Sequence, residues 1–571
     1  MTSFADNLFE FSYNKRKNTE LFKDLETTVG ISKIQNYIPI YKMFFSLNET
    51  NYNQVNLNHK YHLNCISEKK NENRFVGKIE NKNGKIKKQL FLKFSPLLDP
   101  IKYLIGKYDI SNNLFELPIW NKNNCHKKIR NKNNSAYVDA FFSYLSSQLF
   151  HEQRFLNGID FFGSFIGVKK NFYYNIFDDF DYLNNSSFFH QNMDKLFKIE
   201  NNRGDIFSGN SRNRRKKIKI TDEKPNIECE EMPNDLFGDI FKTPNKEKSN
   251  DLKILLSFKD TSKNEIPSDN KKLSKTQDSS STCSSRSSYT DDSSEFSDEE
   301  DDEESSQESS ESEGENEVLN AIIEEFPVNI ICLEGLEDTL DSLLFGGKIL
   351  TIPEWKSIIF QILIMLITYQ KVFSFTHNDL HTNNIMFEKT EKPWLYYCFN
   401  GTYYKVPTFG KIFKIIDFGR AIYNFRDQVV CSDSFQSKGD AATQYNFGPC
   451  LNKKKPILEP NFSFDLTRLA CSLYDYFVPY SDEEHKVTHK IGKLIIKWCK
   501  DDRGKNILYK HNGDERYPDF KLYKMIARTV HNHLPVEEIK NPMFDEFKVT
   551  KKSLKKKRIF NLDILQKYYT K

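Results

Sequence analysis

One segment of the chain, residues 201–317, limits how this protein can fold more than any other feature. Ser, Asp, Glu, Lys and Asn dominate its roughly 117 residues. Apolar side chains are too sparse there to offset the entropy that is lost when a backbone is ordered. We therefore predict a disordered insertion between two folded stretches. Without it, the 571-residue chain is reduced to about 454 residues, which suits one domain with extensions better than several domains.

Charge is distributed unevenly along the chain. Lys and Arg number 83 against 79 Asp and Glu, which gives a net charge of +4. Fifteen of the carboxylates lie between 291 and 317, where there is no Lys or Arg, so the rest of the chain carries about +19. A nucleic-acid partner is still not expected, because no recognisable nucleic-acid-binding module accompanies the basic charge.

Cysteine usage and hydropathy indicate a soluble intracellular protein. The ten cysteines are scattered singly, with no C-x-x-C pair, so neither a disulfide framework nor a zinc ribbon is expected. The N-terminus lacks the apolar core of a secretory signal. The most apolar run, residues 358–369, has twelve residues and is too short to span a bilayer. We expect no membrane partner.

Apolar periodicity predicts strands with one helix, followed by a mainly helical region. Residues 59–94 alternate apolar and polar side chains around an Asn83-Gly84 turn, which indicates an antiparallel hairpin. Residues 135–152 have helical spacing, and 328–333 form a short buried strand. Helices are predicted at about 353–373 and 463–477. This order gives a two-lobed α+β protein.

The densest group of reactive side chains lies in a polar loop after the apolar helix. The loop, with the sequence FTHNDLHTNNIMF at 375–387, contains Asp379 and Asn384. Asp417 follows Asn384 by thirty-three residues, within the sequence IIDFG. Carboxylate and amide oxygens are ligands that suit Mg²⁺, which also binds substrate phosphates.

The pattern His-x-Asp-Leu-x-x-x-Asn followed by Asp-Phe-Gly resembles the catalytic and metal-binding loops of the eukaryotic protein kinase superfamily. The strings THNDLHTNNIMF, KIFKIIDFGRAIY and SFDLTRLACSLYDYF look most like divergent serine/threonine protein kinases encoded by large DNA viruses. The resemblance covers residues 328–500 well and 60–180 in outline. It implies a kinase-like fold with a small β-rich N-lobe plus a helix and a larger, mainly α-helical C-lobe. For a viral protein it implies the host cytoplasm or the virion, with the nucleus as an alternative.

The resemblance also assigns roles to the residues of the two loops. It implies ATP and Mg²⁺ as cofactors, with Asp379 accepting the proton of the substrate hydroxyl and Asn384 and Asp417 holding Mg²⁺. His381 stands where protein serine/threonine kinases usually have a Lys directed at the γ-phosphate, and is a second catalytic candidate. His377 and Gly419 are expected to support the loops.

Nucleotide and backbone contacts are implied at two further places. In the sequence LEGL after the strand at 328–333, the Glu334 carbonyl and the Leu336 amide would meet the adenine edge, with Leu333 as gatekeeper. Asp465 is similar to the buried Asp with which kinases brace the catalytic loop. The alternative for Asp465 is an ordinary helix N-cap.

Lys93 is the candidate for the phosphate-binding lysine, because it is one polar residue in the apolar strand QLFLKF. The alternative is a lysine on the exposed side of an edge strand. Its acidic partner is expected from the helix at 135–152, where Asp139 and Glu152 are the candidates. We prefer Asp139, because it lies within the apolar part of the helix.

Two departures from the kinase pattern bear on activity. No G-x-G-x-x-G precedes Lys93, so another loop must cover the phosphates. Asn378 replaces the Arg of the usual H-R-D and removes the cation that reads a phosphorylated activation loop. Control by activation-loop phosphorylation is therefore not expected.

The predicted organisation has six parts. They are an N-terminal extension at 1–58, a kinase-like N-lobe at 59–200, the insertion at 201–317, the last N-lobe strand and hinge at 318–336, a C-lobe at 337–545 and a basic tail at 546–571.

Three functions fit this sequence. The first is an ATP-dependent serine/threonine protein kinase with unidentified protein substrates, for which the serines of the acidic tract at 279–312 are candidates for autophosphorylation. The second is a small-molecule kinase of the choline or aminoglycoside kinase type, which shares the lobes but commonly lacks both the Asp-Phe-Gly and the helix at 463–477. The third is a pseudokinase scaffold that binds partners through its acidic and basic segments. The missing glycine-rich loop favours the scaffold, and the intact Asp379, Asn384 and Asp417 oppose it.

Overall fold

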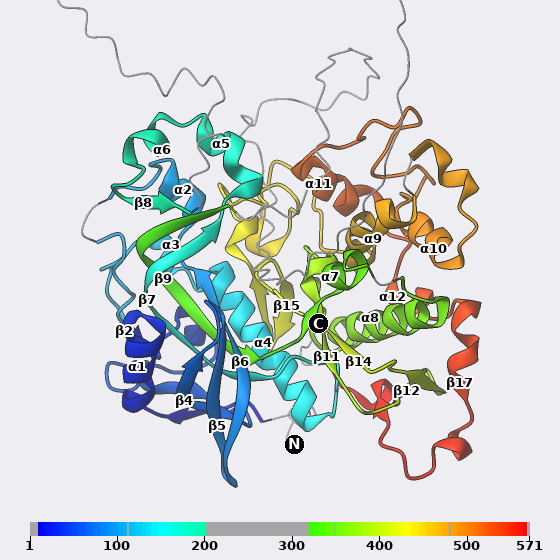
Figure 1. Ribbon diagram of the computed structural model, residues 1–571, viewed down its shortest axis with the longest axis horizontal. Helices are drawn as coiled ribbons and strands as arrows, with labels where there is room; N and C mark the ends of the chain where they lie inside the picture. The colour runs from blue at the N-terminus through cyan, green and yellow to red at the C-terminus, as the bar shows by residue number, and fades with distance from the viewer. Residues whose placement is uncertain (1–9, 111–112, 201–318, 348, 479–480, 568–571) are drawn as a thin grey trace, which may run out of the picture. The chain divides into compact units, whose positions relative to one another are not determined.

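The structure of the chain is a computed structural model that describes residues 10–110, 113–200, 319–347, 349–478 and 481–567. The predicted disordered insertion lies outside the described residues. The described chain is a mixed α+β protein with a β-rich N-terminal part and a largely helical C-terminal part (Figure 1).

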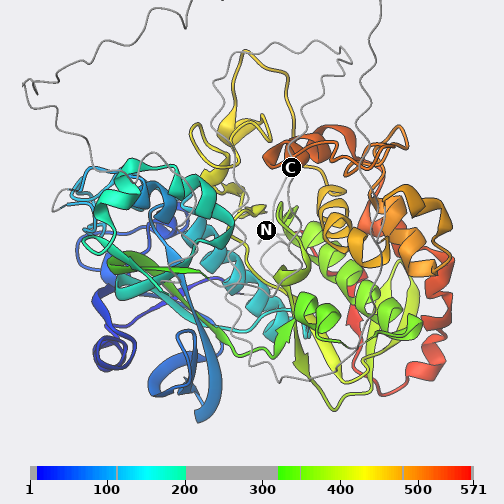
Figure 2. The same ribbon diagram turned by 45° about the horizontal axis from the view of Figure 1, so that its top comes forward.

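A seven-stranded antiparallel sheet is the largest sheet among the described residues, and its long strands β7 and β9 run side by side (Figures 1 and 2). Its strand order is β2-β7-β9-β6-β5-β4, with β8 added beside β9. The strands are β2 (Ile31–Gln35), β4 (His62–Lys69), β5 (Arg74–Asn81), β6 (Gly84–Pro96), β7 (Phe161–Asn175), β8 (Phe197–Ile199) and β9 (Asn320–Glu334). Strands β5 and β6 are the predicted hairpin, with Asn81 opposite Gly84.

The sheet is continuous across the insertion point. The last described residue before it, Glu200, donates its backbone N–H to the Asn320 carbonyl at 2.8 Å. The Asn320 amide returns a hydrogen bond to the Glu200 carboxylate at 2.8 Å. The residue after β8 and the first residue of β9 are therefore neighbours, as an insertion between adjacent strands requires.

Helix α4 (Ser135–Glu152) packs against β7 and β9 of this sheet. Its side chains from 136 to 149 are all buried, so it is a helix enclosed on every side, not an amphipathic surface helix. The Asn134 side chain caps its first turn by accepting the Ala136 N–H at 3.0 Å. The predicted helix at 135–152 is confirmed.

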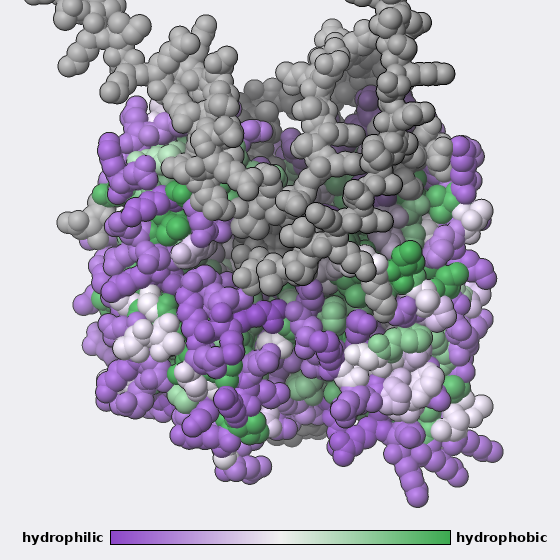
Figure 3. Space-filling view, viewed as in Figure 1, coloured by the Kyte–Doolittle hydropathy of each residue, from purple (hydrophilic) through white to green (hydrophobic). Residues whose placement is uncertain are grey.

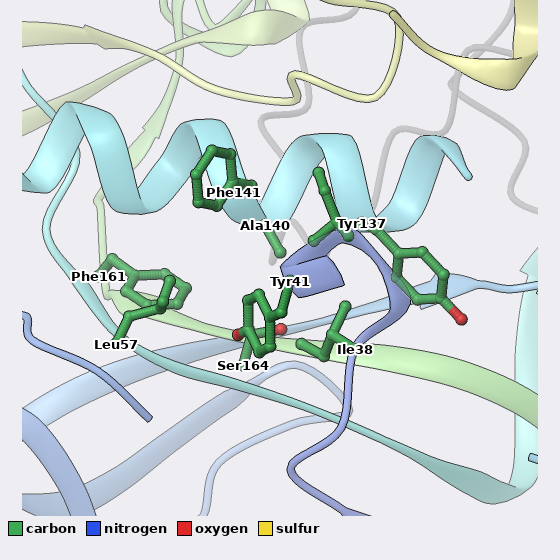
Figure 4. Close-up of a pocket in the computed structure, with 9 residues that line it drawn as sticks. Ile38, Tyr41, Leu57, Tyr137, Ala140, Phe141, Phe161 and Ser164 are labelled. Carbon is green, nitrogen blue, oxygen red and sulfur yellow. The ribbon is translucent and has the colours of Figure 1, made fainter. Parts of the chain in front are cut away.

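One face of α4 packs against the segment that connects β2 to the later strands of the sheet. Tyr137, Ala140 and Phe141, spaced as one helical face, line a narrow crevice with Ile38 and Tyr41 (Figure 4). The crevice is apolar and has no room for a water molecule. It is a seam in the packing, and it fixes α4 from the side opposite to Asp139.

The C-terminal part is built around α8 (Ile352–Phe373), which confirms the predicted helix at about 353–373. Thr351 and Glu354 form a capping box at its start, in which each side chain bonds the backbone N–H of the other residue. The remaining α-helices longer than five residues in the described C-terminal part are α7 (Leu340–Phe345), α9 (Phe464–Phe477), α10 (Lys490–Trp498) and α11 (Phe520–Thr529).

Short sheets complete the described C-terminal part. Strands β10 (Asp338–Thr339), β11 (Ile385–Lys389) and β14 (Lys411–Ile415) form one of them, and β15 (Ile422–Phe425) pairs with β16 (Gln428–Cys431). A four-stranded sheet has the order β17-β13-β12-β18, made by β12 (Trp394–Phe399), β13 (Thr402–Pro407), β17 (Lys548–Val549) and β18 (Phe560–Asn561).

Helix α8 is, among the described residues, the one helix long and apolar enough to span a membrane by length and composition. Within its most apolar window, 89% of the residues are buried inside the protein. The face of the molecule shown in Figure 3 is mostly hydrophilic, with small hydrophobic areas between. The apolar side chains of α8 thus form core, which is consistent with a soluble protein.

A buried ion pair joins the end of the large sheet to the β11–β14 pair. Lys414 Nζ lies 2.6 Å from Glu334 Oε1, and the Lys414 side chain is 0% exposed. The same Glu334 oxygen accepts the Asp160 N–H at 2.7 Å. Burial raises the pKa of Glu334, and the Lys414 charge opposes that rise.

Lys414→Met should destabilise the protein by roughly 3 to 5 kcal/mol, because it leaves a buried carboxylate without its counter-charge. Urea unfolding at neutral pH measures the change. Lys389→Met is the matched control, since the Lys389–Glu337 pair is formed by side chains that are 74% and 45% exposed. The control should change stability little. Equal losses in the two variants would contradict the importance of the buried pair.

Candidate active site

The register of β11 and β14 brings the two polar loops together. Ile385 at the start of β11 lies opposite Ile415 at the end of β14, so the loop before β11 and the loop after β14 leave from the same end of the pair. The Ile416 N–H donates to the Asn384 carbonyl at 3.0 Å. His377 Nε2 donates to the Ile416 carbonyl at 2.9 Å. His377 therefore supports both loops, as its predicted role requires.

Asp465, in the first turn of α9, holds the backbone of the first loop. Its carboxylate accepts the N–H of His377 at 2.8 Å and that of Asn378 at 2.9 Å, and the residue is 0% exposed. The N-cap of α9 is Ser463, which makes no capping bond through its side chain. The side chain of Asp465 thus bonds the loop instead of the end of its own helix. Burial raises the pKa of Asp465.

Lys93 lies between two carboxylates that come from distant parts of the chain. Its Nζ is 2.7 Å from Asp139 Oδ2 on α4 and 2.8 Å from Asp417 Oδ1. The second Asp139 oxygen accepts the Phe418 N–H at 2.9 Å. Lys93 stands on β6, an inner strand between β5 and β9, so it is not an edge-strand lysine. Of the two acidic candidates on the helix, the structure places Asp139 against it.

Electrostatics within this group follow from its burial. Burial alone would lower the pKa of Lys93, but the charges of Asp139 and Asp417 reverse this and raise it. Burial raises the pKa of Asp139, and the nearby Asp417 adds to the rise. Asp417 would also be raised by burial, yet Lys93 holds its pKa below the usual range. One shared cation therefore sets the charge state of two acids.

Asp417 adopts a backbone conformation that is rare for a residue with a side chain. Its φ is +63°, in the left-handed region. Such strain is found where surrounding contacts hold a functional residue in place, and here the contact is with Lys93. Gly419 donates its N–H to Asp417 Oδ1 at 3.4 Å, and a Cβ on Gly419 would approach the same oxygen at 3.4 Å. A side chain at this position would therefore meet the carboxylate at an ordinary contact distance, and the contact of Gly419 with Asp417 is the N–H bond.

Asp379 is nearly enclosed, with 9% of its surface exposed. Its Oδ1 accepts the Tyr523 hydroxyl at 2.7 Å, and its Oδ2 lies 3.8 Å from Arg420 Nε. Burial would raise the pKa of Asp379, but Arg420, His381 and Arg468 together with the Tyr523 hydrogen bond hold it below the usual range. Asp379 is therefore ionised at neutral pH, as a proton acceptor must be.

His381 lies against Asn384, which differs from the contact with a phosphate that its position in the motif implies. The Asn384 amide donates to His381 Nε2 at 3.0 Å and to the Asp379 carbonyl at 2.8 Å. Burial lowers the pKa of His381 to about 4, although Asp379 opposes the shift. A neutral His381 with its proton on Nδ1 fits these bonds. Both bonds use the Asn384 nitrogen, so they orient its carbonyl oxygen.

The side chains present suit a magnesium ion bound mainly through its substrate. Asn384 and Asp417 supply an amide and a carboxylate oxygen, and Mg²⁺ commonly takes one or two carboxylates with phosphates and water. Among the described residues there is no group of three or more His, Cys, Asp or Glu placed to hold a metal. That donor set does not suit a structural zinc site.

The predicted adenine contacts lie at the end of β9. Lys93 is opposite Ile331 in the β6–β9 register, so Leu333, two residues further on, projects from the same face of the sheet as Lys93. Arg74 on β5 donates to the Leu336 carbonyl at 2.7 Å and to the Glu337 carbonyl at 2.8 Å. The backbone after β9 is thus fixed by an arginine that sequence reasoning did not single out.

Sequence reasoning also missed the contacts that hold the segment after Asp417. The Asn378 side chain donates to the Arg420 carbonyl at 3.0 Å and accepts the Tyr445 hydroxyl at 2.7 Å. Asp433 accepts the N–H of Ser135, the first residue of α4, at 3.0 Å, and it pairs with Lys128 at 2.7 Å. No local pattern marks these partners, because they lie far apart in the sequence.

No protein-family model matches the sequence, and no curated protein matches it.

Lys93→Met should destabilise the folded protein more than Asp139→Asn. Removing the lysine leaves the buried Asp139 carboxylate and the partly exposed Asp417 carboxylate without a cation, a loss of roughly 3 to 5 kcal/mol that comes mainly from Asp139, whereas Asp139→Asn leaves Lys93 paired with Asp417. Chemical unfolding at pH 7 and at pH 4 measures both variants. The loss in Lys93→Met should shrink toward acid pH, because protonation of the carboxylates removes their repulsion. A larger loss in Asp139→Asn would contradict the shared-cation arrangement.

Proposed function

We propose that the chain is an ATP-dependent protein kinase of the serine/threonine type with a two-lobed kinase-like fold. The observation that best supports this proposal is the contact of Lys93 with both Asp139 and Asp417. In protein kinases a strand lysine paired with a helix acid, together with the metal-binding Asp of Asp-Phe-Gly, must be in place for activity. Here an aspartate stands where the helix acid of kinases is a glutamate.

The first loop supports the same proposal. Asp379 is ionised and buried, Asn384 is held by the backbone of Asp379, and Asp465 fixes the loop from beneath. Asn384 and Asp417 would hold Mg²⁺, and Lys93 would bind phosphate oxygens. When bound, Mg²⁺ neutralises the charge that develops on the phosphates.

The proposed reaction follows from these positions. The oxygen of a protein hydroxyl attacks the γ-phosphorus of ATP, the bond to the β–γ bridging oxygen breaks, and ADP leaves. Asp379 takes the proton of the hydroxyl. His381, neutral at physiological pH, positions Asn384 instead of supplying a charge. Positioning and charge neutralisation carry most of such catalysis, so few side chains need to react.

Two variants separate the chemical role of Asp379 from the metal-binding role of Asp417. Asp379→Asn should lower kcat for transfer to a generic protein substrate by about 10²- to 10⁴-fold, as expected when a general base is lost. It should keep the stabilisation by Mg-ATP, which reaches roughly 2.7 kcal/mol at a hundred times the dissociation constant. Asp417→Ala should lose both the phosphate transfer and the stabilisation by Mg-ATP. Radiolabel transfer and thermal unfolding with and without Mg-ATP provide the two measurements.

The same experiments distinguish the competing functions. Label transfer to choline or aminoglycosides but never to protein would replace the proposal with a small-molecule kinase. Absence of any thermal shift with Mg-ATP would favour a pseudokinase scaffold.

We also propose the chain's own serine-rich acidic tract, 279–312, as a substrate. Serines there stand beside Asp and Glu, and the tract belongs to the same chain as the site. After incubation with Mg-ATP, mass spectrometry should find phosphate on this tract in the wild type and none in Asp417→Ala. An unmodified tract in both would contradict this substrate and leave the kinase activity to be judged on other proteins.

A further inference from the structure

A tyrosine from α11 contacts the proposed catalytic base. Tyr523 is separated from Asp379 by 144 residues, yet its hydroxyl lies 2.7 Å from Asp379 Oδ1. Tyr523 is 4% exposed, so this contact is inside the protein. A buried hydrogen bond to an ionised carboxylate is among the stronger kinds and has a defined direction.

Arg468 fixes the direction of the Tyr523 hydroxyl. Arg468 Nε donates to the tyrosine oxygen at 2.8 Å, and an arginine can only donate. The tyrosine proton is therefore left to point at Asp379. Burial raises the pKa of Tyr523 to about 12, with Asp379 adding to the rise, so the hydroxyl keeps this proton at neutral pH. The two hydrogen bonds therefore run in one direction: Arg468 donates to Tyr523, and Tyr523 donates to Asp379.

The ring of Tyr523 is packed as core. It stacks on Phe520 with centroids 5.4 Å apart, and the guanidinium carbons of Arg468 and Arg420 lie 5.1 Å and 5.6 Å from its centroid. A side chain held by stacking, two cations and two hydrogen bonds does not leave its site easily. These contacts favour a fixed residue over a plug that a substrate displaces.

The contact uses only one oxygen of Asp379. Tyr523 occupies Oδ1, while the cation nearest to Oδ2, Arg420 Nε, is 3.8 Å away and beyond hydrogen-bond distance. The hydrogen bond at Oδ1 restricts the rotation of the carboxylate, and it thereby gives Oδ2 a preferred direction. That second oxygen is then available to a hydroxyl that arrives with the substrate.

We propose that Tyr523 is a positioning residue that holds Asp379 through Oδ1, so that Oδ2 receives the proton of the acceptor hydroxyl. This inference rests on the proposed kinase function. Arg468 belongs to the same device, because it aligns the tyrosine hydroxyl. Two residues of α9 therefore support the site: Asp465 bonds the backbone of the first loop, and Arg468 bonds the hydroxyl of Tyr523.

Tyr523→Phe tests the proposal in the full chain, with ATP and a generic protein acceptor. We expect kcat to fall by about tenfold to a hundredfold, the range in which misplacement of a catalytic group is felt. The KM for ATP and the thermal shift with Mg-ATP should stay unchanged, because Tyr523 does not contact Lys93, Asn384 or Asp417. A purely structural residue would lower thermal stability without this separation of kcat from KM.

Tyr474→Phe is the matched control. Its hydroxyl is also buried, donates to a carboxylate, Glu484, at 2.9 Å and accepts a hydrogen bond from Asn506 at 3.0 Å. It should lose a comparable stability and keep its kcat. Arg468→Lys is the second test variant, since it keeps the charge and loses the fixed Nε donor. It should lower kcat by less than Tyr523→Phe and can be measured even if Tyr523→Phe does not fold.

The outcomes separate this inference from the function on which it rests. If wild type transfers phosphate and Asp379→Asn does not, an unchanged kcat in both Tyr523→Phe and Arg468→Lys overturns the positioning role. A higher kcat in Tyr523→Phe overturns it as well, by making Tyr523 an inhibitory plug. Phosphate found on Tyr523 would make it an acceptor and also overturns it. If wild type transfers no phosphate, the proposed function itself has failed, and the inference falls with it.

Discussion

The arrangement of this protein depends on one cation shared by two acids, one buried and one partly exposed. Lys93 comes from the large sheet, Asp139 from α4 and Asp417 from the loop after β14, so three elements far apart in sequence meet at one nitrogen. The Asp139 carboxylate would be costly to bury without the lysine, and the largely enclosed lysine would be costly to place there without the two acids. Strand, helix and loop therefore have to take their positions together. The apolar seam between α4 and residues 38–41 supports this from the other side of the helix, because it leaves α4 no free face along which to shift.

The insertion does not interrupt the element that carries the lysine. Glu200, directly after β8, and Asn320, the first residue of β9, are hydrogen-bonded neighbours. β9 then runs on between β7 and β6 and places Ile331 opposite Lys93. The register at the site is thus fixed by strand pairing within the described chain. A long connection between adjacent strand ends adds little to the cost of closing the loop, since that cost grows only with the logarithm of its length.

Sequence reasoning succeeded where a signal is local. The helix α4, the capped start of α8 and the Asn83-Gly84 hairpin follow from periodicity and turn chemistry, and the Asp379 and Asp417 loops follow from short motifs. β9 is longer than the predicted strand at 328–333. A proline argues against a central strand, so the sequence pattern indicates only the part of β9 that follows Pro327. Glu334 was singled out for its backbone carbonyl, yet its side chain makes the buried pair with Lys414.

No local sequence pattern indicates that Tyr523 belongs to the site. Its role arises from the packing of α11 against α9, which no pattern around position 523 encodes.

The replacement of the usual arginine by Asn378 has a structural counterpart. An arginine at that position would need a phosphate to complete its contacts, whereas Asn378 is already bonded to the Arg420 carbonyl and to Tyr445. Further along the same segment, the Asp433 carboxylate bonds Ser135 at the start of α4 and pairs with Lys128, contacts of the kind that an added phosphate makes with a helix N-terminus and a basic side chain. Because α4 carries Asp139, these bonds hold the segment after Asp417 and the partner of Lys93 in one arrangement. In the proposed kinase, Asp433 would supply a negative charge at this position without phosphorylation.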